Sequence, residues 1–135
     1  MLDKQHASLK ESAAALRFEV DRPTPDMEAL ARAKWRLGYR LAVHLAHEDR
    51  HVYPILIAHA DHRIASLAAL YEREMGDLDQ RFRDYIARWS SDMVTSEWPA
   101  YRLATYTILD ALAQRIDRED RELYPLVDDE RASRR

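Results

Sequence analysis

The chain has 135 residues, a length that suits one domain, residues 1–135, with a single hydrophobic core. Its 21 basic and 24 acidic residues are mixed along the sequence and give a net charge of −3, which argues against a nucleic-acid-binding surface. There is no cysteine and no run of 18 apolar residues, so we expect neither disulfides nor a membrane span and predict a cytoplasmic protein.

Helix-forming residues dominate the sequence, and only two glycines and five prolines interrupt it. Breaks near residues 21–25, 59–61 and 90–96 divide the chain into four segments. We expect helices at residues 2–20, 26–59, 62–89 and 97–128. Pro54 should kink the second helix or end it early, because proline lacks a backbone N–H and clashes with the preceding turn.

Each segment carries a stripe of residues at spacings of three and four, which is typical of a bundle helix. Polar side chains interrupt the second stripe, which runs through Leu37, Leu41, His44, Glu48, Val52 and Ile55. The third stripe is apolar and runs through Ile64, Leu67, Tyr71, Met75, Leu78, Phe82, Tyr85 and Trp89. Because short connections make neighbouring helices antiparallel, we predict an all-α, up-down-up-down four-helix bundle whose second and fourth helices are diagonal and parallel.

One segment of the sequence occurs twice. Residues 44–54 and 115–125 share the pattern Glu-Asp-Arg-x-x-Tyr-Pro in register. The first and fifth positions of this segment lie on one face of a helix, four residues apart. In the first copy they are His44 and Glu48, at a spacing typical of metal ligands, whereas the second copy has Arg115 and Glu119. An arginine is a permanent cation that cannot bind a metal.

The chain resembles the hemerythrin-like domains of the HHE cation-binding family over essentially its whole length. The resemblance rests on His44-x-x-x-Glu48 with Tyr53-Pro54, on Glu119 with Tyr124-Pro125, and on a histidine in the first helix. It implies an up-down bundle that holds two non-haem iron atoms. The ligand positions that it implies are His6, His44, Glu48, Tyr71, Met75, Arg115 and Glu119. Three of these residues, Tyr71, Met75 and Arg115, stand where the family has imidazoles, so we expect a degenerate diiron site.

This cluster has two interpretations, of which we predict the first and keep the second as the alternative. In the first, the guanidinium of Arg115 donates to Glu48 and Glu119, and a protonated His6 or His44 balances the charge. The domain would then be a metal-free binding or regulatory module with no cofactor. In the second, His6, His44, Glu48 and Glu119 bind one metal ion, and the domain is an iron-dependent sensor or carrier of oxygen, nitric oxide or iron.

Other features of the sequence bear on activity and partners. A phosphate-binding loop, a cysteine nucleophile and a nucleophile elbow are all missing from the sequence, so we do not expect an enzyme. Trp35, Tyr39 and Tyr106 fall off the core stripes, and we interpret them as a surface for a protein partner, because aromatic residues are enriched at interfaces. The partner's identity and the oligomeric state stay open.

Overall fold

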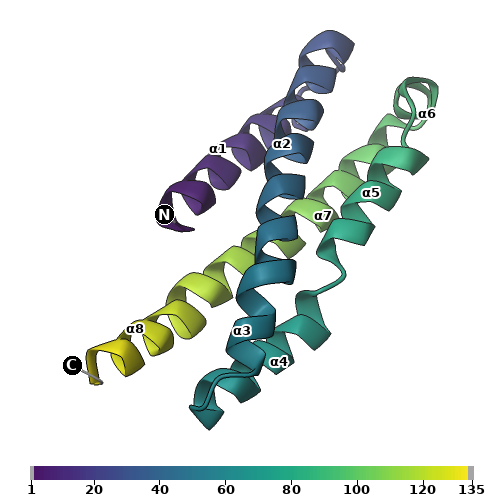
Figure 1. The fold of residues 1–135 in the computed structure, drawn as a ribbon. Coiled ribbons are helices and arrows are strands. Elements are labelled where there is room, and N and C mark those ends of the chain that lie inside the picture. The colour runs from purple at the N-terminus through teal and green to yellow at the C-terminus, as the bar shows by residue number, and fades with distance from the viewer. Residues whose placement is uncertain (1, 134–135) are drawn as a thin grey trace.

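The computed structural model describes residues 2–133, which form helices and no strand. The first helix of the bundle is α1 (Leu2–Val20), and the second runs through α2 (Met27–His47), the π-helical turn η1 (Glu48–Val52) and α3 (Tyr53–Ile57). The third consists of α4 (His62–Met75) and α5 (Leu78–Arg88), followed by a short helix α6 (Ser91–Ser96). The fourth runs through α7 (Trp98–Arg118), the π-helical turn η2 (Glu119–Leu123) and α8 (Tyr124–Ser133). The predicted all-α four-helix bundle is confirmed (Figure 1).

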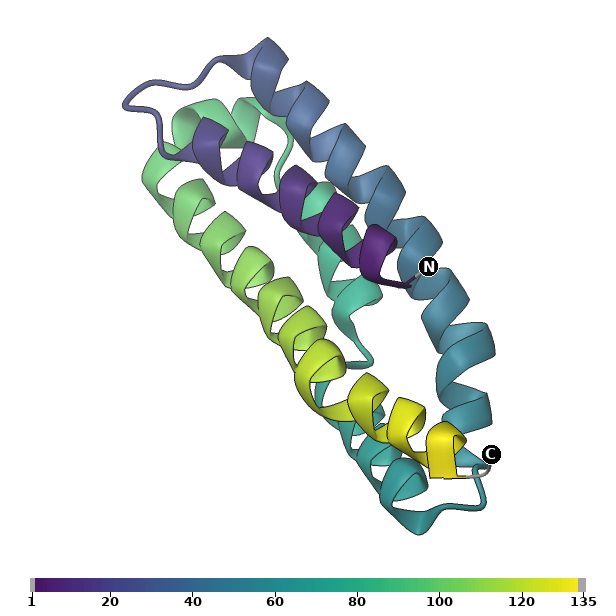
Figure 2. The same ribbon diagram turned by 90° about the vertical axis from the view of Figure 1, so that its left-hand side faces the viewer.

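The order of the helices in space follows the prediction. α1 packs against α2 and α7, and α5 packs against the same two helices. α2 and α7 therefore lie diagonally across the bundle and run in the same direction (Figure 2). Two helices start at predicted breaks, where Asp26 accepts a hydrogen bond from the N–H of Ala29 and Asp61 accepts one from the N–H of Arg63.

Three predicted boundaries were wrong. The third helix is not continuous over residues 62–89, because it breaks at Gly76 and Asp77 between α4 and α5. A Cβ at position 76 would lie only 2.4 Å from the carbonyl oxygen of Glu72, which explains the glycine there. The stretch predicted as a break after residue 90 contains α6, and the fourth helix extends to Ser133 instead of residue 128.

Both copies of the repeated segment form a π-helical turn. The N–H of Tyr53 donates to the carbonyl of Glu48, and the N–H of Tyr124 donates to the carbonyl of Glu119, five residues earlier in each case. Pro54 and the corresponding Pro125 follow directly. A proline ring clashes with the carbonyl four residues before it in a regular α-helix, and the wider turn relieves that contact. The second helix therefore continues past Pro54 and ends at Ile57.

The π-helical turn also changes which residues face the core. A π-turn holds one residue more than an α-turn, so the inward face shifts by one position beyond it. Val52 is half-buried and Ile55 is 67% exposed, whereas Tyr53 and Leu56 are buried. The predicted stripe of the second helix was therefore wrong after Glu48.

Apolar side chains pack in two clusters along the bundle. One cluster lies between α1, α2, α5 and α7 and includes Leu45 and Ile116, and the other includes Tyr53 and Leu123. The glutamates of the two π-helical turns fall between these clusters, where a layer of buried polar side chains separates them. Within residues 2–133, no helix combines the length and apolar character that crossing a membrane requires.

Candidate metal centre

Four buried side chains from three helices converge in the polar layer. His6 comes from α1, His44 from α2, and the carboxylates of Glu48 and Glu119 from η1 and η2. None of the four residues is more than 4% exposed. Each offers one donor atom, and these atoms lie within 4.8 Å of one another. The structure thus brings together the four residues that the sequence identified as candidate ligands.

Outer hydrogen bonds turn both imidazoles toward the centre. His6 Nδ1 lies 2.7 Å from a carboxylate oxygen of Asp120, and His44 Nδ1 lies 2.6 Å from the amide oxygen of Gln5. Since both oxygens are acceptors, each Nδ1 carries the hydrogen and donates it. In a neutral ring the remaining nitrogen, Nε2, then presents a lone pair, and the two Nε2 atoms face each other at 3.2 Å. This arrangement of an outer acceptor behind an imidazole is the usual one at metal sites.

Three of the spacings between the inner donor atoms match those around a single metal ion. Besides the two Nε2 atoms, His6 Nε2 lies 3.3 Å from Glu119 Oε1, and His44 Nε2 lies 3.2 Å from Glu48 Oε1. An ion with four bonds of about 2.0–2.1 Å in a tetrahedron has neighbouring donors about 3.3 Å apart. Glu119 Oε1 is buried without a hydrogen-bond partner among the described residues, which is costly unless a cation or a proton lies beside it.

A tyrosine from each copy of the repeated segment donates a hydrogen bond to the glutamate of the other copy. Tyr53 of the first copy donates its hydroxyl to Glu119 Oε2 at 2.7 Å, and Tyr124 of the second copy donates to Glu48 Oε2 at 2.5 Å. Burial and the two glutamates raise the pKa of both phenols, so the hydroxyls stay protonated donors. Each carboxylate is thereby fixed in orientation by the other half of the repeat.

Arg115 lies inside the cluster, as predicted from the sequence. Its side chain is 2% exposed, and it donates from Nη2 to Glu48 at 3.2 Å and from Nε to Glu119 at 3.3 Å. The same Nη2 donates to Asp49 at 2.7 Å, and Nη1 donates to the carbonyl of Met75 at 3.2 Å. The guanidinium is therefore held by four oxygen atoms.

The charges of the cluster shift the pKa of its members. Burial alone would lower the pKa of His6, but hydrogen bonds and charge from Glu119, Glu48 and Asp120 raise it to about 10. Although burial opposes it, His44 and His6 hold the pKa of Glu48 well below its usual range. Burial raises the pKa of Glu119, and the nearby charge of Glu48 adds to this. The raised pKa of His6 therefore favours a proton on this residue at neutral pH when no metal is bound.

Two positions implied by the family resemblance do not contribute side-chain ligands to the cluster. Tyr71 donates its hydroxyl to Glu122 at 2.5 Å, and the guanidinium of Arg118 lies 4.3 Å from the centre of its ring. Met75 offers its backbone carbonyl to Arg115. The residues present therefore fit one metal ion on the histidine side and do not fit a second ion on the side of Arg115.

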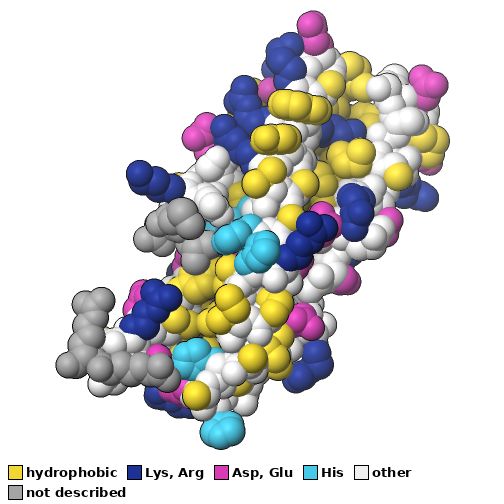
Figure 3. All heavy atoms as spheres, in the orientation of Figure 1, with side chains coloured by type: hydrophobic (Ala, Val, Ile, Leu, Met, Phe, Trp, Pro, Cys, Tyr) yellow, Lys and Arg dark blue, Asp and Glu magenta, His cyan; other side chains and the backbone are white. Residues whose placement is uncertain are grey.

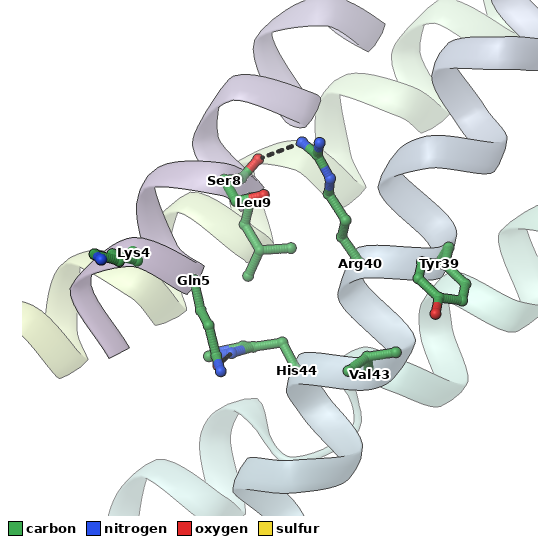
Figure 4. A pocket seen from close by; sticks show the side chains of 8 residues that line it. All are labelled: Lys4, Gln5, Ser8, Leu9, Tyr39, Arg40, Val43 and His44. Atoms are coloured by element: carbon green, nitrogen blue, oxygen red, sulfur yellow. Dashed lines mark hydrogen bonds between the residues drawn. The ribbon is translucent and has the colours of Figure 1, made fainter. Parts of the chain in front are cut away.

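A surface pocket reaches the outer side of the cluster. It has a volume of about 270 Å³ and lies between α1 and α2 (Figure 4). At one end Arg40 donates to the carbonyl of Ser8, and at the other end the hydrogen bond between Gln5 and His44 closes the pocket. Leu9 lies between these two hydrogen bonds, and Val43 lines the pocket beside His44. Gln5 and the candidate ligand His44 thus both line this pocket, joined by their hydrogen bond.

The three aromatic residues predicted to face a partner differ in exposure. Trp35 and Tyr39 are 72% and 62% exposed, and their rings stack with centroids 5.7 Å apart. Hydrophobic side chains follow the same outer face of α2 in Figure 3. Tyr106 differs from the expectation, because it packs against the core, donates to Asp21 and lies under Arg17. It belongs to the contact between the first and fourth helices.

Sequence reasoning assigned no role in the site to five residues that surround the candidate ligands, namely Gln5, Asp49, Tyr53, Asp120 and Tyr124. Four of these belong to the repeated Glu-Asp-Arg-x-x-Tyr-Pro pattern, which was itself the available signal. Its conserved spacing in two copies indicates that the aspartate and the tyrosine serve the same layer as the glutamate. No comparable pattern marks Gln5.

Fold and site together define an all-α bundle with a cluster of histidine and glutamate donors for a cation in its interior. Comparison with known families agrees, since residues 1–127 match the Hemerythrin HHE cation binding domain. The chain belongs to this family. No curated protein and no solved structure matches it significantly.

Proposed function

We propose that this domain binds a single divalent transition-metal ion through His6, His44, Glu48 and Glu119. The observation that carries the proposal is the convergence of four donor atoms with separations of 3.2–3.3 Å along three edges. Two imidazoles and two carboxylates suit iron(II) or another ion of similar hardness. Bound there, a divalent ion supplies positive charge that neutralises the two carboxylates and links the first, second and fourth helices.

A sensor or carrier fits this site better than an enzyme does. All four donor residues are almost completely buried, which leaves a substrate little access to them. His6 is the sole candidate ligand from α1 within the described residues. Metal binding would therefore fix α1 against the rest of the bundle, so that occupancy of the site changes the stability of that helix.

The metal-free network expected from the sequence is the second state of the same cluster. The raised pKa of His6 supports it, because a proton on His6 Nε2 can be donated to His44 Nε2 or to Glu119. Metal and proton then compete for one position. The cytoplasmic location, the single-domain organisation and the absence of nucleic-acid binding stay predictions.

Metal titration of the full chain tests the proposal. Protein purified without an affinity tag and stripped with EDTA is titrated with Co²⁺, and binding is followed by calorimetry and by the visible spectrum of cobalt. We expect one ion per chain, and loss of that binding in His44→Ala and in Glu119→Gln. The matched control is the double variant His47→Ala/His51→Ala, which removes the neighbouring histidine pair on the surface, whose rings lie 5.6 Å apart. Binding that survives in His44→Ala and disappears in the control would refute the proposal.

A further inference from the structure

Arg115 occupies a cage of oxygen atoms beside the proposed metal site. The cage consists of one oxygen each from Glu48, Asp49 and Glu119 and the carbonyl oxygen of Met75, at 2.7–3.3 Å from the guanidinium nitrogens. Three carboxylates and a carbonyl form a donor set for a cation, and here the cation is a side chain of the protein. The guanidinium ranks among the largest side chains that are fully buried in the described residues.

Both glutamates connect the cage to the histidine side of the cluster. Glu119 directs Oε1 to His6 at 3.3 Å and Oε2 to Arg115 at 3.3 Å. Glu48 Oε1 lies 3.2 Å from His44 Nε2 and 3.2 Å from Arg115 Nη2. Each carboxylate therefore spans two adjacent cation positions, as a carboxylate does when it bridges two metal ions.

The third helix completes the cage with backbone instead of side chains. α4 ends at Met75, and the break at Gly76 leaves carbonyl groups at its C-terminus without partners in the helix. These carbonyls carry partial negative charge, which favours a cation. One of them, the carbonyl oxygen of Met75, accepts a hydrogen bond from Arg115 Nη1. The break in the third helix and the arginine in the fourth thus form one arrangement.

We infer that Arg115 is a built-in second cation, which limits the domain to one bound metal ion. An arginine keeps its charge at every accessible pH, so the cage cannot be vacated by deprotonation. This inference rests on the proposed function for the first ion, but the cage itself does not require a metal to be present. Removal of the side chain should leave a cavity lined by oxygen atoms that accepts an external cation.

The first test uses Arg115→Ala in the full chain without metal. Ethylguanidinium at about 20 mM should raise the melting temperature of the variant by several degrees relative to the same concentration of sodium chloride, and should leave the wild type unchanged. The matched control is Arg118→Ala, which removes an arginine that contacts Tyr71 and Glu74 outside the cage. If Arg115→Ala does not fold alone, recovery of its helical circular dichroism by ethylguanidinium supports the inference. Absence of rescue at Arg115→Ala, or equal rescue at Arg118→Ala, overturns it.

The second test measures metal stoichiometry. Mn²⁺ titrations followed by electron paramagnetic resonance should give one ion per chain in the wild type and two in Arg115→Ala. Arg115→Lys keeps the charge and should still bind one. A wild type that binds no metal would contradict the proposed function but not the inference about Arg115, because the ethylguanidinium test is carried out without metal. A wild type that binds two ions would overturn the inference.

Discussion

Tyr124→Phe removes one hydroxyl that the structure places at the centre of the polar layer. This hydroxyl donates to Glu48 Oε2 at 2.5 Å, whereas His6 Nε2 lies farther from the same oxygen, at 3.8 Å. A hydrogen bond to a charged group contributes about 1.5–3 kcal/mol to stability. We therefore expect the variant to lose about 2 kcal/mol of unfolding free energy. For a domain of this size that corresponds to a decrease of roughly 6–10 °C in melting temperature.

Tyr53→Phe should cost less than Tyr124→Phe. The oxygen that loses the Tyr53 hydroxyl, Glu119 Oε2, keeps a hydrogen bond from Arg115 Nε at 3.3 Å. Because the two glutamates lie in one network, the costs in the double variant should not add. The order of the two single variants distinguishes a specific network from general loss of packing.

Urea unfolding in EDTA at pH 7, followed by circular dichroism, measures these differences. The control is Tyr39→Phe on the outer face of α2, where the side chain is 62% exposed and the change should stay within about 0.5 kcal/mol. A Tyr124→Phe variant that unfolds at the same urea concentration as this control would refute the role of the reciprocal tyrosines.

Three further predictions concern protonation, metal exchange and the surface. In the metal-free protein, the stability that comes from the raised pKa of His6 should be fully present below about pH 6.5 and lost as the pH rises toward about 10. His6→Gln should abolish this pH dependence. Urea unfolding measures it, and a wild-type stability that stays constant over this pH range would contradict the prediction. Gln5→Ala should weaken Co²⁺ binding about 10- to 100-fold and speed release of the ion to a chelator. The control variant Lys4→Ala, at an exposed residue, should change neither. Equal Co²⁺ affinities of the Gln5→Ala variant and the wild type would exclude a role for Gln5. Replacing Trp35 and Tyr39 together by Ala should leave the unfolding free energy nearly unchanged yet abolish capture of a protein partner, and unchanged capture would rule this surface out.

The bundle could be predicted because its stripes follow the helical period. The predicted stripe of the third helix holds across the break at Gly76, because Met75 before the break and Leu78 after it are both buried. The π-helical turn could not be predicted from periodicity, because a period of 3.6 residues assumes that the helix is regular. Val52 and Ile55 were assigned to the core for that reason, and Tyr53 was left out of the core stripe.

The candidate ligands were also visible in the sequence, but their outer partners were not. His44 and Glu48 are four residues apart, a local relation that a helix turns into a shared face. Asp120 reaches His6 across 114 positions of the chain, and Gln5 reaches His44 across 39. Such contacts depend on the rotation of each helix about its axis, which the stripes fix only to within about one residue.

The duplicated segment explains how the cluster accommodates two different cations. Each Glu-Asp pair directs its glutamate to the centre and its aspartate to one side: Asp49 accepts from Arg115, and Asp120 accepts from His6. Each side therefore has an aspartate behind the group that carries its positive charge. On one side that charge is a permanent guanidinium, and on the other it is a proton on His6 or the proposed metal ion. Because the first charge is fixed and the second is exchangeable, binding or loss of the proposed metal ion would act on one side of the cluster only, while Arg115 keeps its hydrogen bonds to Glu48 and Glu119.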